Sequence, residues 1–168
     1  MIRFASLSAL LLATIAVAHA QPANQRAEAE ARGFLLPCHQ PDQKRQDDCR
    51  THQQYFVELF IAARSGEISS MELLAGQFNH TGSIGLPRDQ VQACAWQLAA
   101  ADLAPTAQQY GARMDARNVC GALSPLRYAH AEDRADRIVQ QIQTEPTQLP
   151  KWTPPPGLTS TASPLQPN

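Results

Sequence analysis

The sequence has little of what marks several large functional classes. Basic and acidic side chains nearly balance, with a formal net charge of −1, so no basic surface for nucleic acid or an anionic membrane is predicted. A phosphate-binding glycine loop and a Gly-x-Ser-x-Gly nucleophile elbow are both missing. We therefore expect no cofactor, no bound metal and no catalytic residues, and we interpret the protein as a non-enzyme.

Long apolar runs are also missing, except at the N-terminus. Arg3 precedes an apolar segment from Phe4 to Val17, and Ala18 to Ala20 has the small residues of a signal-peptide cleavage site. This run is too short to cross a bilayer comfortably. Residues 1–20 are therefore predicted to be a signal peptide, and the exported chain, periplasmic or else secreted, would not be inserted in a membrane.

The four cysteines all lie in the part of the chain that would be exported. They are Cys38, Cys49, Cys94 and Cys120. An even number of cysteines in an oxidising compartment indicates two disulfides, although four cysteines allow three connectivities. We favour Cys38–Cys49 with Cys94–Cys120, because each pair would then lie within one pair of neighbouring helices.

One group of residues could instead hold a metal ion. It comprises Cys38, His39, Cys49 and His52. The Cys49 and His52 side chains are spaced to lie on one face of a helix, as zinc ligands do. The group has no Cys-x-x-Cys pair, however, so a disulfide is the preferred interpretation.

Residues Ala63 to Asp102 have the pattern of two short helices joined by a glycine-marked turn. The expected buried stripe of the first helix comprises Ile68, Met71, Leu74, Ala75 and Phe78. The expected stripe of the second helix comprises Val91, Ala95 and Leu98, with Trp96 beside them. Ser69 and Glu72 fit a capping box, and Pro87 fits the first turn of the second helix. Trp96 is interpreted as a core residue rather than a ligand-stacking one.

This stretch resembles a Sel-1-like repeat, a relative of the tetratricopeptide repeat. The matching positions are Ala63, Gly66, Leu74, Gly76, Gly82, Gly85, Asp89, Ala93, Trp96 and the pair Ala99-Ala100. Phe78 stands where a tyrosine is common, and Ile84 lies inside the turn. The resemblance implies an all-α fold, a short array of antiparallel helix pairs, in which Gly76 and the alanines allow close approach between helices.

Four further helices are expected around this pair. Asn24 is a candidate N-cap for a helix ending near Gly33, and a second helix covers about Asp48 to Arg64. Pro105 opens a helix to about Met114, and Ser124-Pro125 opens a long last helix. The residues expected to be buried on them are Tyr55, Phe56, Leu59, Phe60 and Ala63, then Ala107, Tyr110 and Met114, then Ala131, Ala135, Ile138 and Ile142.

From Pro146 the composition changes to proline, serine and threonine without apolar periodicity. The sequence therefore predicts a helical domain over residues 21–145 and an unstructured tail over residues 146–168. Trp152 is the one large apolar residue of this tail.

The functional expectation is an exported, non-catalytic helical protein that binds an unidentified protein partner, and the motifs do not indicate which process it serves. One alternative is an inhibitor or immunity-type binder of a secreted effector. Another is a wall-active hydrolase that uses His39, His52 or His80 with nearby carboxylates. His130 is interpreted as a surface residue.

Overall fold

The computed structural model describes residues 22–39, 41–80 and 85–148. In these ranges the chain forms six helices and no strand, which confirms the expected all-α fold. The helices are α1 (Ala23–Gly33), α2 (Gln43–Arg64), α3 (Ile68–Asn79), α4 (Gln90–Leu103), α5 (Thr106–Cys120) and α6 (Pro125–Thr144). None of the described helices is long and apolar enough to cross a membrane.

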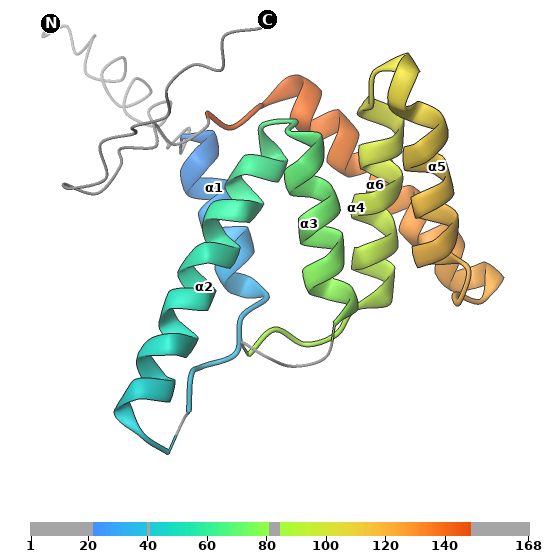
Figure 1. The fold of residues 1–168 in the computed structure, drawn as a ribbon. Coiled ribbons are helices and arrows are strands. Elements are labelled where there is room, and N and C mark those ends of the chain that lie inside the picture. The colour runs from blue at the N-terminus through green and yellow to red at the C-terminus, as the bar shows by residue number, and fades with distance from the viewer. Residues whose placement is uncertain (1–21, 40, 81–84, 149–168) are drawn as a thin grey trace, which may run out of the picture.

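Helix α4 lies at the centre of the packing. Each helix from α1 to α4 packs on the next one in the chain, and α6 then returns to pack along α4 (Figure 1). Helix α4 therefore contacts α3, α5 and α6, and nine of its 14 residues are buried. Helices α5 and α6 follow each other in sequence but contact each other marginally at most, so they do not form an antiparallel pair.

An aromatic cluster joins α2, α3 and α4 to the segment after α1. The ring of Phe34 stands edge-on to Phe78 at 5.0 Å, and Phe60 stands edge-on to Trp96 at 5.4 Å between ring centroids. Phe56 meets Phe78 in the same way at 5.6 Å. Edge-to-face contacts of this kind add to the free energy gained by burying the rings. The cluster includes Phe78 and Trp96, both fully buried as expected.

The other repeat positions are also largely internal. Leu74, Ala93 and Ala99 have no exposed surface. Tyr55 is an exception to the expected stripe of α2, since 49% of its surface is exposed. Ala107, Tyr110 and Met114 are exposed as well, because α5 instead buries Ala112, Ala116 and Cys120. The small side chains allow α5 to lie close against α4.

Capping residues explain two differences in where helices begin. The Asp42 carboxylate accepts a hydrogen bond from the Arg45 backbone N–H, so α2 begins at Gln43 rather than near Asp48. Asp89 accepts from the backbone N–H groups of Val91 and Gln92, so α4 begins after Pro87 instead of including it.

Three further expectations about helix ends need correction, and one is confirmed. Asn24 lies inside α1 and does not cap it. Helix α3 has Glu67 at its N-cap without a side-chain cap, so Ser69 and Glu72 form no capping box there. Helix α5 runs to Cys120, beyond Met114, because its last turns carry the alanines that pack on α4. Pro125 does occupy the first turn of α6, as expected.

Two glycines of the repeat pattern differ in whether the structure requires a glycine at that position. Gly85 has φ of +70°, and a Cβ atom there would lie 2.9 Å from the Leu36 carbonyl oxygen. A Cβ atom at Gly76 would meet no heavy atom within 4 Å. The expected close approach of helices at Gly76 is therefore wrong, because the neighbouring helix does not reach this point of α3.

The first disulfide supports the end of α2 that extends away from the other helices (Figure 1). It joins Cys38 to Cys49, whose Cα atoms are 6.0 Å apart. The bond ties the segment before α2 to the helix itself. Cys94 is bonded to Cys120, so both favoured pairings are present.

The chain still packs on the helices after α6 ends. Thr147 is buried, its hydroxyl donates to the Ile61 carbonyl oxygen at 2.6 Å, and Gln148 exchanges two hydrogen bonds with the Asn24 side chain. Thr147 and Gln148 therefore contact the helices although they follow the boundary expected after Glu145. The expectations for residues 1–20, Gly82, Ile84 and Trp152, and for the tail beyond Gln148, lie outside the described residues.

Thr147→Val should lower the free energy of unfolding by about 1 kcal/mol, because it removes a buried hydrogen bond while preserving the shape of the side chain. Thr144→Val is the matched control, since the Thr144 hydroxyl bonds within its own exposed helix turn. Urea denaturation of the chain over residues 21–168 measures both. Equal effects of the two substitutions would contradict a structural role for the segment after α6.

Gly85→Ala and Gly76→Ala should have opposite effects on stability. The first forces a side chain into a left-handed backbone conformation and should cost about 1 to 3 kcal/mol. The second adds a better helix former where space is free and should add about 0.5 to 1 kcal/mol. Thermal unfolding compares the stability of the two variants. Destabilisation by Gly76→Ala would show that a neighbouring helix does lie close to α3 at Gly76.

Candidate functional site

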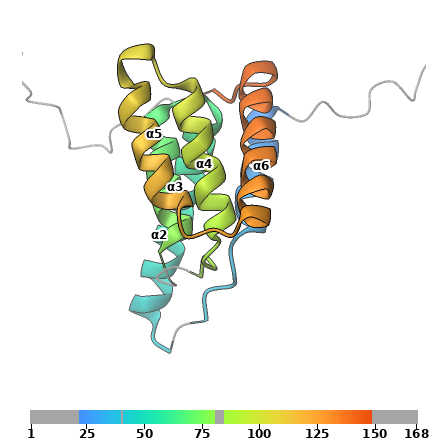
Figure 2. The same cartoon turned by 90° about the vertical axis from the view of Figure 1, so that its right-hand side faces the viewer.

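Helices α5 and α6 lie on either side of α4 (Figure 2), and residues of all three helices line one groove. Its volume is about 630 Å³, within the range of ligand-binding clefts. The lining comprises Leu98, Ala101 and Asp102 from α4, Arg113, Ala116, Arg117 and Cys120 from α5, and Gly121, Leu123, Pro125 and Tyr128 from the turn and α6. Three helices and one turn therefore contribute to a single concave site.

The groove exists because α5 and α6 pack on different sides of α4. Helix α5 uses the buried residues Ala112 and Ala116, and it lies close to α4 for that reason. Helix α6 buries Ala131, Ala135 and Ile138 on its own face. With α4 between them, the two walls stand apart, and the turn that begins at Gly121 closes one end.

The second disulfide fixes one wall of the groove. Cys94 of α4 is bonded to Cys120 at the end of α5, with 5.0 Å between their Cα atoms. Both residues are buried. Because α5 otherwise contacts α4 mainly through small side chains, this bond carries much of the positioning of α5.

The two walls differ in charge. Arg113 and Arg117 lie on α5, and neither forms an ion pair or a side-chain hydrogen bond with the residues that the structure describes. On the other wall, burial raises the pKa of the Tyr128 hydroxyl. The carboxylates of Glu132 and Asp102 raise this pKa further, whereas Arg117 lowers it. Helix α5 thus supplies the cationic wall.

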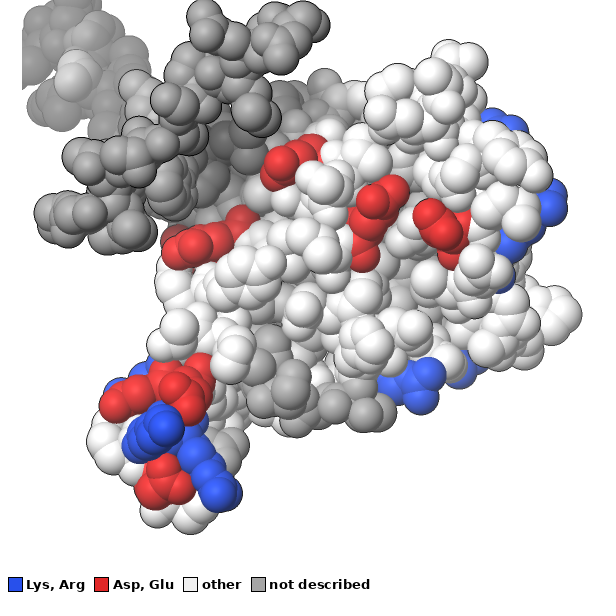
Figure 3. Space-filling view, in the orientation of Figure 1, with Lys and Arg blue, Asp and Glu red and all other residues white. Residues whose placement is uncertain are grey.

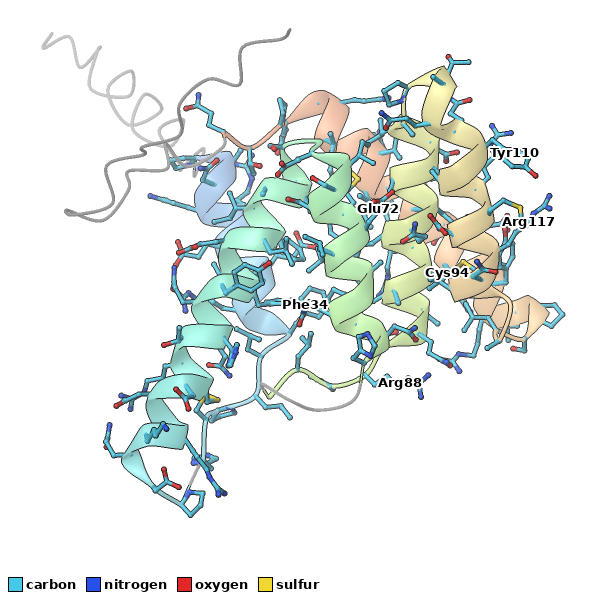
Figure 4. All side chains as sticks on the ribbon, viewed as in Figure 1. Phe34, Glu72, Arg88, Cys94, Tyr110 and Arg117 are labelled. Atoms are coloured by element: carbon cyan, nitrogen blue, oxygen red, sulfur yellow. A yellow bond between two sulfur atoms is a disulfide. The ribbon has the colours of Figure 1, made fainter. Side chains whose placement is uncertain are left out.

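The outward face of α5 extends the groove onto the surface. Tyr110, Arg113, Met114 and Arg117 are spaced three, four and seven residues from the first, so they form one stripe on the helix. We call these four residues the α5 stripe. Tyr110 is 80% exposed and Met114 is 40% exposed. Tyr110 and Arg117 both project outward from α5 (Figure 4).

Charge is unevenly placed on the face seen in Figure 3. Acidic groups are scattered over it, Glu72 of α3 among them, whereas basic groups lie at its edges (Figures 3 and 4). One of these edges is formed by α5, and another is the far end of α2, where basic and acidic groups are mixed. The basic groups at the α5 edge include Arg113 and Arg117 of the groove lining, and the exposed Asp115 lies on the same helix.

The residues considered for metal binding or catalysis do not line the groove. Cys38 and Cys49 are joined to each other, so neither is a thiolate ligand, and the zinc alternative is not supported. His39, His52, His80 and His130 are all exposed. Across the described ranges, no group of three or more metal-binding side chains comes together.

Trp96 lies in the core rather than in the groove. It has no exposed surface, and its indole N–H has no hydrogen-bond partner among the described residues.

The sequence did not point to the groove itself, because the residues that line the groove come from three helices. The spacing of the α5 stripe is visible in the sequence, but Tyr110 and Met114 look like core residues there.

No family model matches the chain, and no curated protein or solved structure shows significant similarity to it. The resemblance to Sel-1-like repeats over residues 63–102 therefore stays a prediction.

Removing the Cys94–Cys120 bond by Cys94→Ala with Cys120→Ala should loosen α5 selectively. The loop-closure model gives a loss of about 3 to 4 kcal/mol in stability for a bond of this span. Amide hydrogen exchange should rise more in α5 than in α3. The matched control, Cys38→Ala with Cys49→Ala, should leave hydrogen exchange in α5 unchanged. If removal of the Cys94–Cys120 bond also left exchange in α5 unchanged, this bond would not be what positions α5.

Proposed function

We propose that this protein is an exported, non-catalytic helical protein that binds a protein partner through the groove between α5 and α6. The observation that carries the proposal is the groove itself, with its apolar floor and its two arginines that lack ion-pair partners on the described surface. The groove is lined by a tyrosine and two arginines, with Tyr110 and Met114 exposed beside it, and these residue types are enriched in protein interfaces.

The cysteine usage supports export. Every cysteine is in a disulfide, and no free cysteine is present. Disulfides of this kind persist in oxidising compartments such as the periplasm or the extracellular space. Together with the signal-peptide pattern of residues 1–20, they favour a protein that acts outside the cytoplasm.

The arrangement of polar groups supports binding rather than catalysis. General acid–base or nucleophilic catalysis needs a reactive side chain with a second group to activate it. The groove offers Arg113, Arg117, Asp102 and Tyr128, and its one cysteine, Cys120, is already bonded to Cys94. These groups suit recognition of charge and shape. Inhibition of a secreted effector is one form that such binding would take.

Photo-crosslinking tests the proposal directly. Tyr110 is replaced by p-benzoylphenylalanine in the full chain, expressed in cells that export it, and the cross-linked products are identified by mass spectrometry. Tyr55 carries the same replacement as a matched control, because it is also an exposed tyrosine but lies on α2. We expect one product at a stoichiometric level from position 110 and none of the same mass from position 55.

Two results would contradict the proposal. One is the absence of any specific product at position 110 from an oxidised, exported chain. The other is an identical set of products from both positions, because that would indicate nonspecific contact rather than a binding face.

A further inference from the structure

The α5 stripe has the composition of an interface helix that lacks its partner. Its four residues are one tyrosine, one methionine and two arginines, types that are enriched at the centres of protein interfaces. Among the described helices, only α4 packs extensively on α5. No other described helix therefore covers the α5 stripe. Tyr110 is the most exposed large apolar residue that the structure describes.

The charge on this helix defines what the partner must carry. Arg113 and Arg117 are four residues apart, so their guanidinium groups lie one turn apart on the same side of α5. Neither has a carboxylate partner within ion-pair distance on the described part of the chain. A partner with two carboxylates at the same spacing would satisfy both groups, and arginine binds carboxylates in two-pronged geometry.

The opposite wall sets the orientation of such a partner. Asp102 of α4 lines the groove, and both Asp102 and Glu132 of α6 lie close enough to Tyr128 to raise its pKa. Their charges would repel the carboxylates of a partner that bound in the reverse orientation. The acidic side of the partner therefore faces α5, and its apolar side faces the floor formed by Leu98 and Ala101.

The size of the groove suits one face of a helix. A helix is about 10 Å across and rises about 5.4 Å per turn, so each turn fills roughly 420 Å³. The groove of about 630 Å³ would thus take the buried face of about two or three turns. A small carboxylate would also fit the volume, but it would leave Tyr110 and Met114 uncovered outside the groove.

We propose that the groove and the α5 stripe bind an acidic amphipathic helix of the partner protein, with two carboxylates four residues apart on Arg113 and Arg117. This inference rests on the proposed function and specifies the chemistry of the partner. It corresponds to the recognition mode in which an amphipathic helix lays its apolar face into a groove.

A displayed peptide library tests this inference. The library consists of helical peptides with leucines fixed along one face and with glutamate or lysine encoded equally at the flanking positions. It is selected on the oxidised chain over residues 21–168. We expect glutamate at two positions four residues apart to be enriched over lysine by about tenfold or more.

Charge reversal supplies the decisive comparison. Arg113→Glu with Arg117→Glu should select lysine at the same positions, and this gain of binding would also show that the variant is folded. Arg45→Glu with Arg50→Glu is the matched control, because it changes the net charge equally at exposed positions on α2. It should select the same acidic peptides as the unmodified chain.

A second variant separates a helix from a small ligand. Tyr110→Ser should weaken the binding of a selected acidic peptide by about tenfold, measured by fluorescence anisotropy. Octanoate serves as the small amphipathic carboxylate in parallel thermal unfolding experiments. Stabilisation by octanoate with no peptide selected would overturn the helix proposal.

Other outcomes would overturn the inference as well. These are the absence of selected peptides, equal selection of glutamate and lysine, and identical selection by the charge-reversed variant.

A concentration-dependent dimer that is lost in the charge-reversed variant would assign the α5 stripe and the groove to a second copy of the chain. If the Tyr110 cross-link is found but no acidic preference appears, the proposed function stands and this inference fails. If acidic peptides are selected but position 110 yields no cross-linked partner, the groove prefers acidic helices and the proposed function fails.

Discussion

The packing of α4 between three other helices is the constraint on which the rest of the structure depends. Its alanines allow α3, α5 and α6 to approach, and Trp96 fills the space toward Phe60 of α2. Such packing leaves no room for a large side chain at the alanine positions. Helix α4 thereby fixes where the neighbouring helices lie, and the aromatic cluster around Phe78 completes the core on one side.

The groove is a direct result of how unequally α5 and α6 are held. Helix α6 packs on α4 with its own apolar face and is linked to α2 by Arg64, which hydrogen-bonds to Gln141. Burial lowers the pKa of Arg64, while the charges of Glu30 and Glu145 oppose this change. Helix α5 has a thin apolar face and relies on its disulfide. It therefore stands apart from α6 and leaves part of α4 uncovered.

Much of the helical pattern could be predicted because it depends on local spacing. The stripe at Ala131, Ala135, Ile138 and Ile142 is buried as expected, and Cys94 is bonded to Cys120 between the neighbouring helices α4 and α5. The errors have local causes too. Asp42 extends α2 by capping it earlier, and Tyr55 points away from the core although its spacing fits the buried stripe. The contact of Thr147 with Ile61 could not be expected from a proline-rich composition.

The sequence by itself determined that the chain is helical, because apolar residues recur at helical spacing and capping residues, prolines and glycines mark the helix ends. It also indicated two disulfides, although four cysteines by themselves allow three connectivities. Only the tertiary structure decided that α6 packs on α4 rather than on α5, because that choice depends on how whole helix faces fit together. The groove, its charged wall and the exposure of Tyr110 all follow from that choice, since each depends on residues from helices that are distant in the sequence.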